Sequence, residues 1–479
     1  MTSRINMRFA SVSICLIALA AVANSQQVIT YVTSQGGDRI SAKPVIRFRL
    51  VANTRENFRI DDAVRDQEIV GFGASFLESG MICLNSLDHE GQEKVLRSLF
   101  DLGSGAGFTA MKTVIGATDF MAAGPFYSYD DHPGDTALKF FSIERDLKEN
   151  GLIPYIRRAR QYGHFVLQAP MDYPPDWMLV GGKNQDVNPQ YFPALARYYV
   201  KYAQAYQKAG VFIDFVSLFN EPSIYTKISP DMVRDLLRDD VGPAFTKEGL
   251  KNGIQACEPN TRKNALRYLP VILEDPKARK YVGSIAYHGY EYKDYDKIVA
   301  LHHRYPELKL WMTEVCHSYD TDTSRKHPMP YLDYADGDFW GNRIFDDLEV
   351  GTSAWIYWNM ILDQNGGPWL VSPKHEDFDK NNQHPIVVID RQKHEVTYTG
   401  LYYYLSHFSK FVRPGAVRLQ STGSMKGVRC VVFRSKDGGL VMEVMNSLKQ
   451  PTSPVVKWRD RTLTLNLPAM SISTYLWKG

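Results

Sequence analysis

Two glutamates stand at the ends of apolar, β-rich runs that are typical of buried strands. Glu221 comes just after the run at residues 212–219, and Glu314 directly follows the run at residues 308–313. Pro222 ends the first strand at this point because it has no backbone N–H to donate. A lone carboxyl at a strand end is more often a solvated or ion-paired surface group. A pair of carboxyls can instead serve as a general acid and a nucleophile.

These two roles require the carboxyl groups to face each other. The runs place Glu221 on about the fourth strand and Glu314 on about the seventh strand of a barrel, on opposite sides of its mouth. A retaining glycosidase needs two carboxyl groups about 5–5.5 Å apart, one protonated and one ionised. The pattern therefore favours a two-carboxylate glycosidase, in which Asn220 can hydrogen-bond a substrate hydroxyl.

The elements that must position these glutamates alternate from residue 67 onward. Helical patterns cover residues 85–102, 146–162 and 193–209. The β-rich runs lie at residues 69–73, 109–115, 164–169, 212–219, 268–273, 282–287, 308–313 and 353–358. This alternation predicts an α/β fold, a (β/α)8 TIM barrel. An open doubly wound sheet is the alternative, but no Gly-rich phosphate loop follows an early run.

Segments from both chain ends predict a second domain. Short β-rich runs without intervening helices lie at residues 28–33, 45–51, 417–419, 428–433, 440–444, 455–458 and 463–465. They indicate an attached antiparallel β-sandwich. The expected division is a signal peptide at 1–25, N-terminal sandwich strands at 26–66, the barrel at 67–400 and the C-terminal sandwich at 401–479.

Composition and the chain start narrow the class of protein. The net charge is 56 − 53 = +3, and 44% of the residues are hydrophobic, so a globular protein without nucleic-acid partners is expected. Arg4 and Arg8, an apolar run at 10–22 and a small-x-small pattern at 23–25 predict a secretory signal, with an uncleaved anchor as the alternative. We expect an extracellular or lysosome-like compartment and no transmembrane segment.

The cysteines give no metal-binding pattern. Beyond the signal they are Cys83, Cys257, Cys316 and Cys430, far apart and without a C-x-x-C motif. The two-carboxylate mechanism implies no metal and no organic cofactor. The sequence leaves the pairing of these thiols open.

Several segments together resemble glycoside hydrolase family 30, in its glucosylceramidase branch. They are GFGAS at 71–75, FNEPS at 219–223, AYHGY at 286–290, TEVC at 313–316, WIYWN at 355–359, GGPW at 366–369, YYYLSHFSKF at 402–411 and SISTYLW at 471–477. The resemblance runs in order from about residue 60 to residue 479. It implies a retaining barrel enzyme with a side β-sandwich, Glu221 as general acid/base and Glu314 as nucleophile.

The resemblance also points to residues that bind the sugar. Asp119, after the second run, matches an Asp that holds sugar hydroxyls, with a turn or helix cap as the alternative. His288 and Tyr290 follow the sixth run, where a Tyr could orient the nucleophile. Two further candidates, Trp358 and Asn359, end the eighth run. We expect Trp177 either to line the sugar pocket or to pack in the core.

This chain departs from the family pattern near the expected sugar site. Lys112 occupies the place of an Arg that anchors the nucleophile in relatives, and Lys lacks the bidentate fork. We expect Lys112 to be charged and to point into the mouth, the alternative being an outward direction between barrel and helices. Met171 replaces a Trp in the loop after the third run, which has one residue more, and Phe219 replaces a polar residue.

These features together predict a retaining β-glycosidase. Glucosylceramide is the preferred substrate, with peripheral contact to lipid surfaces. An endo-acting hydrolase of a β-linked polysaccharide, such as a 1,6-glucan or galactan, is the alternative within the class. A carbohydrate-binding pseudoenzyme on the same fold is the alternative outside it, although a binder has no need of both Glu221 and Glu314.

Overall fold

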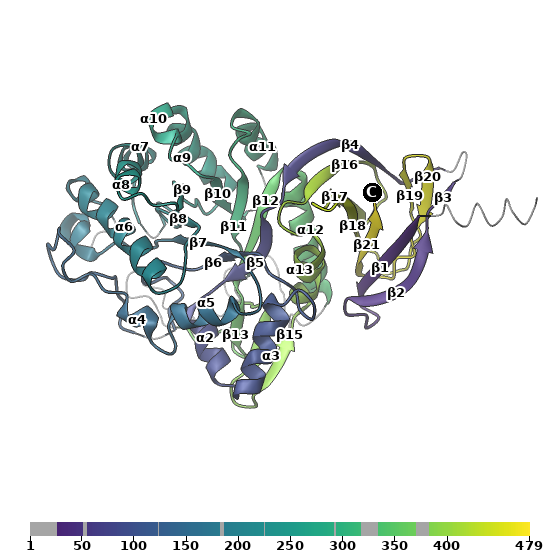
Figure 1. Ribbon diagram of the computed structural model, residues 1–479, viewed down its shortest axis with the longest axis horizontal. Coiled ribbons are helices and arrows are strands. Elements are labelled where there is room, and N and C mark those ends of the chain that lie inside the picture. Colours follow the sequence, from purple (N-terminus) through teal and green to yellow (C-terminus); the bar gives the residue numbers. More distant parts are fainter. Residues whose placement is uncertain are drawn as a thin grey trace, which may run out of the picture. The chain divides into compact units, whose positions relative to one another are not determined.

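The computed structural model forms two compact units, which we describe separately (Figure 1). It describes residues 26–50, 55–122, 124–182, 186–224, 226–291, 294–317, 334–369 and 383–479. The larger unit spans residues 67–415, and the smaller one combines residues 26–66 with residues 416–479. The expected secretory signal at 1–25 lies outside the described residues.

The larger unit is built on eight parallel strands, as predicted. Their order is β10-β11-β12-β5-β6-β7-β8-β9, and a parallel bridge between Ile254 and Val282 closes the ring from β9 toward β10. The strands are β5 (Gly71–Ser75), β6 (Ala110–Lys112), β7 (Val166–Pro170), β8 (Phe215–Ser217), β9 (Gly253–Gln255), β10 (Ile285–His288), β11 (Leu310–Glu314) and β12 (Thr352–Asn359). Parallel strands of this kind are covered on both faces, which explains why β11 and β12 are buried throughout.

Helices alternate with these strands and cover the barrel (Figure 1). They are α2 (Glu78–Asn85), α3 (His89–Phe100), α4 (Glu144–Leu147), α5 (Leu152–Ala159), α6 (Phe192–Lys208), α7 (Pro230–Asp235), α8 (Gly242–Lys247), α9 (Arg262–Glu274), α10 (Pro276–Arg279), α11 (Tyr295–Arg304), α12 (Tyr334–Glu349) and α13 (Gly400–Phe411). A π-helix, η4 (Leu236–Val241), joins α7 to α8, and 3-10 turns η1 (Asp176–Met178), η2 (Val180–Gly182) and η3 (Pro189–Tyr191) precede α6. No helix among the described residues combines the length and the apolar character of a membrane span.

The fifth strand is not where the sequence suggested. Residues 268–273 lie within α9, and the fifth strand is β9, at residues 253–255. The side chain of Thr261 accepts a hydrogen bond from the Asn264 N–H at 3.1 Å and so caps the start of α9. The apolar run was misread because one face of a helix and a short buried strand can share the same residue types.

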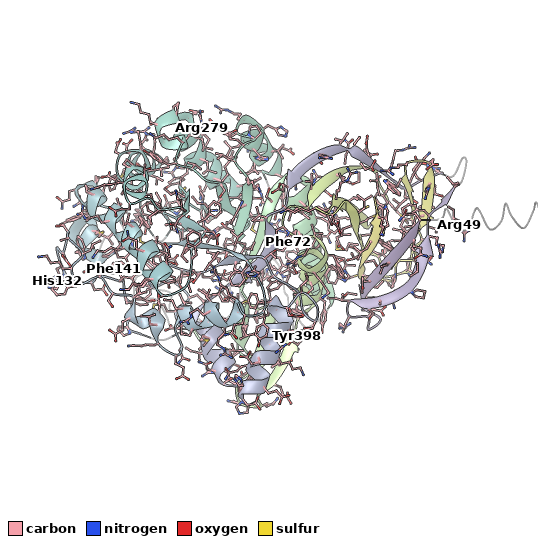
Figure 2. All side chains as sticks on the ribbon, viewed as in Figure 1. Arg49, Phe72, His132, Phe141, Arg279 and Tyr398 are labelled. Atoms are coloured by element: carbon pink, nitrogen blue, oxygen red, sulfur yellow. The ribbon has the colours of Figure 1, made fainter. Side chains whose placement is uncertain are left out.

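The larger unit extends to residue 415, past the expected junction at residue 400. The reason is α13, whose Phe408 ring packs 5.6 Å from Phe72 on β5 and 5.5 Å from Phe345 on α12. Figure 2 labels Phe72 among the side chains that fill the space between strands and helices. A small sheet of β13 (Ile361–Asp363), β14 (Val387–Asp390) and β15 (Glu395–Tyr398) completes this unit.

The smaller unit is a ten-stranded sheet assembled from both chain ends. Its order is β2-β1-β21-β18-β17-β16-β4-β19-β20-β3. The strands are β1 (Gln27–Ser34), β2 (Ser41–Arg47), β3 (Arg49–Leu50), β4 (Phe58–Glu68), β16 (Val417–Gly423), β17 (Val428–Arg434), β18 (Gly439–Asn446), β19 (Val455–Trp458), β20 (Arg461–Thr464) and β21 (Ser471–Lys478). The pairs β1–β2, β1–β21, β16–β17, β17–β18, β18–β21, β19–β20 and β20–β3 are antiparallel, whereas β19 pairs with β4 in parallel. Rings of Phe48, Trp458 and Trp477 pack within 5.7 Å of one another in its core.

Candidate active site

The two glutamates meet at the carboxyl ends of the barrel strands. Glu314 is the last residue of β11, and Glu221 lies four residues beyond the end of β8. Both side chains are nearly buried, with 6% of Glu221 and 5% of Glu314 exposed. A carboxylate oxygen of one lies within 4.8 Å of a carboxylate oxygen of the other. An approach this close agrees with the spacing of about 5–5.5 Å between the carboxyl groups of retaining glycosidases, whereas inverting enzymes hold these groups about 6.5–9.5 Å apart.

The backbone at Glu221 is held in an unusual conformation. Its φ is 40°, in the left-handed region that non-glycine residues seldom adopt. The Glu221 N–H donates to the Glu258 carbonyl at 2.9 Å, and the Asn220 N–H donates to the Met171 carbonyl at 2.9 Å. These bonds fix the segment between its neighbours, and strained backbone of this kind is common at functional sites.

His288 contacts Glu221 directly. Its Nδ1 lies 2.8 Å from Glu221 Oε1, its Nε2 lies 3.4 Å from Glu258 Oε2, and its side chain is fully buried. Burial would lower the pKa of His288, and so would the charge of Lys112. The charge of Glu314 and the bonds to the other two glutamates outweigh both and raise that pKa to about 9. His288 is therefore cationic at neutral pH and donates from both ring nitrogens.

Glu221 is suited to hold a proton. Burial raises the pKa of its carboxyl, and the nearby charge of Glu314 raises it further. The hydrogen bond and the charge of His288, and the charge of Lys112, oppose this rise. The direction is the one that a general acid needs.

Both oxygens of Glu314 are held by neighbours. Lys112 Nζ lies 2.7 Å from Oε2, and the Tyr290 hydroxyl donates to Oε1 at 2.8 Å. Lys112 is fully buried and points into the mouth, where its Nζ lies 5.1 Å from the ring centre of Trp358. Burial would lower the pKa of Lys112, but the charges of Glu258 and Glu314 raise it. An ammonium and a phenol thus fix the carboxylate in one orientation.

Glu258 belongs to this cluster and was not predicted from the sequence. It follows β9 and is fully buried, and its Oε2 accepts from Lys112 Nζ and from Gln168 Nε2, both at 3.2 Å. Burial would raise the pKa of Glu258, but chiefly the charge of Lys112 lowers it to about 2. The sequence did contain a pattern that could have indicated Glu258, because Pro259 follows Glu258 as Pro222 follows Glu221.

Asn220, Trp358 and Asn359 also lie in the barrel mouth. Asn220 Oδ1 accepts from Lys112 Nζ at 3.1 Å. Asn359 is fully buried and donates through Nδ2 to Gln383 Oε1, so its amide orients a neighbour. The Cys316 thiol lies 3.6 Å from the same Gln383 oxygen.

Two further candidates lie in loops after the barrel strands. Asp119 is half-buried, and its carbonyl accepts from Trp369 Nε1 at 2.8 Å, which brings that indole to the predicted sugar site. Trp177 is half-buried, and its Nε1 donates to the Asp130 carbonyl at 2.9 Å. Among the described residues, no hydrogen bond joins Trp177 to Glu221 or Glu314.

A metal ion would compete with groups already in place. Among the described residues, Glu221, His288 and Glu314 form the group whose ligand atoms are close enough for a metal. Lys112 already supplies a positive charge at Glu314, and a protonated His288 has no lone pair for a metal. The cluster is thus better suited to proton transfer.

Comparison with known proteins identifies the family. The family model "Glycosyl hydrolase family 30 TIM-barrel domain" matches residues 69–412, and "Glycosyl hydrolase family 30 beta sandwich domain" matches residues 415–475. The chain belongs to glycoside hydrolase family 30. It is therefore a glycoside hydrolase, with a glycan or glycoside as its substrate.

Similar proteins fall into more than one substrate class. The chain is 29% identical over 454 residues to "Endo-1,6-beta-D-glucanase" of Neurospora crassa, covering 87% of this chain and 89% of that one. It is 26% identical over 443 residues to "Lysosomal acid glucosylceramidase" of Mus musculus, covering 86% and 81%. A solved endo-beta1,6-glucanase has a TM-score of 0.81 at 22% identity, covering 95% and 99%, and supports the fold.

Proposed function

We propose that this family 30 hydrolase cleaves β-glucosidic bonds with retention of configuration, with Glu314 as nucleophile and Glu221 as general acid/base. The observation that carries the proposal is the approach of the two carboxylates to within 4.8 Å. The two carboxyl groups have the different surroundings that the two roles require. Glu221 is buried and its pKa is raised, whereas Glu314 is hydrogen-bonded to the ammonium of Lys112.

The reaction then proceeds in two displacements. Glu314 attacks the anomeric carbon, the bond to the leaving oxygen breaks, and Glu221 gives its proton to that oxygen. The ionised Glu221 next removes a proton from water, whose oxygen attacks the anomeric carbon. The bond to Glu314 breaks, and the sugar leaves with its original configuration.

Glucosylceramide is the first candidate substrate. The family segments in this sequence and the murine glucosylceramidase support it. With this substrate the protein would enter the secretory pathway and act at a lipid surface in an extracellular or lysosome-like compartment.

A β-1,6-glucan is the second candidate. The Neurospora crassa endo-1,6-glucanase supports it over nearly the whole chain. Both candidates present a β-glucosyl unit to the same two carboxylates and differ in what that unit is attached to. Met171 stands where relatives have a Trp, and this change is compatible with either ceramide or a glucan chain as the leaving group.

Product stereochemistry tests the proposed reaction. We expect proton NMR of an aryl β-glucoside digest to show β-glucose first, followed by slow mutarotation. The Glu314→Gln variant should be folded and inactive, whereas Glu307→Gln, an exposed residue just before β11, should retain full activity. First release of α-glucose, or turnover by Glu314→Gln, would contradict the mechanism.

A substrate panel then separates the two candidates. Glucosylceramide in vesicles and a linear β-1,6-glucan should be compared at equal enzyme concentration, with release of ceramide and of reducing ends as the readouts. Preference for the vesicle supports the lipid, and preference for the glucan supports the polysaccharide. Cleavage of neither, with the aryl glucoside hydrolysed, would contradict both assignments.

A further inference from the structure

A short segment at the end of β10 carries two of the side chains in the barrel mouth. It spans residues 288–291, and its His288 and Tyr290 contact the two candidate catalytic glutamates. The Tyr290 hydroxyl donates to Glu314 Oε1 at 2.8 Å, and the Gly289 N–H donates to the Glu314 carbonyl at 2.9 Å. The placement of this segment therefore bears on both the carboxylate and the backbone of Glu314.

Arg343, on α12, is hydrogen-bonded to the backbone on both sides of Tyr290. Its Nη2 donates to the Gly289 carbonyl at 2.7 Å and to the Glu291 carbonyl at 3.3 Å. Its Nη1 donates to the Tyr295 hydroxyl, and 4% of Arg343 is exposed. A planar, forked guanidinium fixes the direction of the groups that it binds, so Arg343 restrains the backbone next to Tyr290.

A second buried arginine holds the last residue of the segment. Arg262, on α9, is fully buried and donates through Nη1 to the Glu291 carbonyl at 2.9 Å. Its backbone N–H donates to Glu291 Oε1 at 2.7 Å, and its guanidinium forms an ion pair with Asp347. Asp347 lies one helical turn after Arg343 on α12, so α9 and α12 are joined where they hold the segment.

Two buried guanidinium groups are unfavourable for the fold unless they serve some further purpose. Removing a charged group from water costs free energy, and an apolar side chain of similar size often gives an equally stable or more stable core. Stability alone therefore does not explain why α12 places Arg343 here. An apolar residue at this position could fill the space, but it could not donate to the carbonyls that flank Tyr290.

We propose that Arg343 is a positioning residue for the hydrolysis. Its bonds to the two carbonyls place the Tyr290 hydroxyl, and that hydroxyl orients the Glu314 carboxylate for attack. A displacement of about 1 Å at a reacting group can lower a rate by about a hundredfold, so a residue that restrains Tyr290 can affect kcat. The inference rests on the proposed function, because it takes Glu314 to be the nucleophile.

A double-mutant cycle on an aryl β-glucoside tests whether Arg343 acts through Tyr290. Arg343→Met keeps a long side chain without donors, and we expect it to lower kcat about tenfold with little change in KM, as we expect for Tyr290→Phe. The double variant should also lie about tenfold below wild type, because the hydroxyl that Arg343 positions is already gone. Arg304→Met, at an exposed arginine of α11, should leave kcat unchanged.

The cycle separates positioning from a purely structural role. Urea unfolding of each variant gives the folded fraction, and kcat is expressed per folded enzyme. Losses that multiply to about a hundredfold in the double variant would overturn the proposal, and so would an unchanged kcat in folded Arg343→Met.

Tyr295→Phe carries the same cycle if Arg343→Met does not fold, because it removes only the hydroxyl that accepts from Arg343 Nη1. We expect it to lower kcat about threefold in the wild-type background and not at all in the Tyr290→Phe background. The same loss in both backgrounds, or no loss in either, would overturn the proposal.

Failure of the proposed function gives a different result. In that case 2-deoxy-2-fluoro-β-glucosyl fluoride would not label Glu314 of the wild-type enzyme, whatever the cycle shows. A label on wild-type Glu314 together with multiplying losses in the double variant would reject the role of Arg343 alone.

Discussion

Replacing Glu258 with Gln tests whether this buried carboxylate holds the cationic side of the active site together. Its Oε2 lies 3.2 Å from Lys112 Nζ and 3.4 Å from His288 Nε2. Gln keeps the shape and an acceptor oxygen but removes the charge. The substitution therefore measures the electrostatic contribution with little change in packing.

The pKa of Glu258 sets the expected difference in the free energy of unfolding between wild type and Glu258→Gln. That pKa falls from an ordinary 4.5 to about 2, a difference of 4.5 − 2 = 2.5 pH units. At about 1.36 kcal/mol per unit, the charge contributes about 3 kcal/mol to the free energy of unfolding. Because the folded-state pKa is the lower one, this contribution is complete above pH 4.5. It is lost as the pH falls toward 2.

Urea unfolding, followed by tryptophan fluorescence at several pH values, measures the difference between wild type and Glu258→Gln. We expect about 3 kcal/mol at pH 7 and a steadily smaller difference below pH 4.5. Glu395→Gln serves as the control, because Glu395 is exposed on β15. A difference that stays constant between pH 3 and pH 7, or no difference at pH 7, would refute the reasoning.

Three substitutions at the reacting groups give further tests. Glu221→Ala should lose the basic limb of the pH–rate profile, and azide should restore turnover of an activated aryl glucoside; a surviving basic limb would place the acid elsewhere. Lys112→Ala should lower kcat by about tenfold or more, because the ammonium 2.7 Å from Glu314 Oε2 holds that carboxylate in place. An unchanged kcat would argue against that role. Tyr290→Phe should lower kcat by about tenfold with little change in KM; a change confined to KM would show that the hydroxyl serves binding instead.

The barrel was predictable where its strands carry long apolar runs. β11 and β12 are buried on both faces, so their residues are apolar almost without interruption, and the sequence shows this directly. β9 has only three residues, with Ile254 as its one apolar side chain. Such a segment shows no periodicity, and the apolar face of the following helix, α9, was mistaken for the strand.

The candidate site was predictable where a carboxyl residue directly follows an apolar run that is typical of a buried strand. Glu221 and Glu314 were proposed in this way and lie together in the barrel mouth, and Lys112 points into the same mouth. Glu258 was missed because its strand was missed. Its partner Lys112 is 146 residues away along the chain, and only closure of the barrel brings them together. Pairings of this kind follow from three-dimensional packing and leave no local pattern.

Covalent trapping of the nucleophile tests the central claim most directly. A 2-deoxy-2-fluoro-β-glucosyl fluoride slows the second displacement, so the glycosyl-enzyme should accumulate and can be digested and mapped by mass spectrometry. We predict one fluoroglucosyl group on Glu314, and none in the Glu314→Gln variant. A label on another carboxylate, or turnover of the natural linkage without any covalent intermediate, would contradict the account.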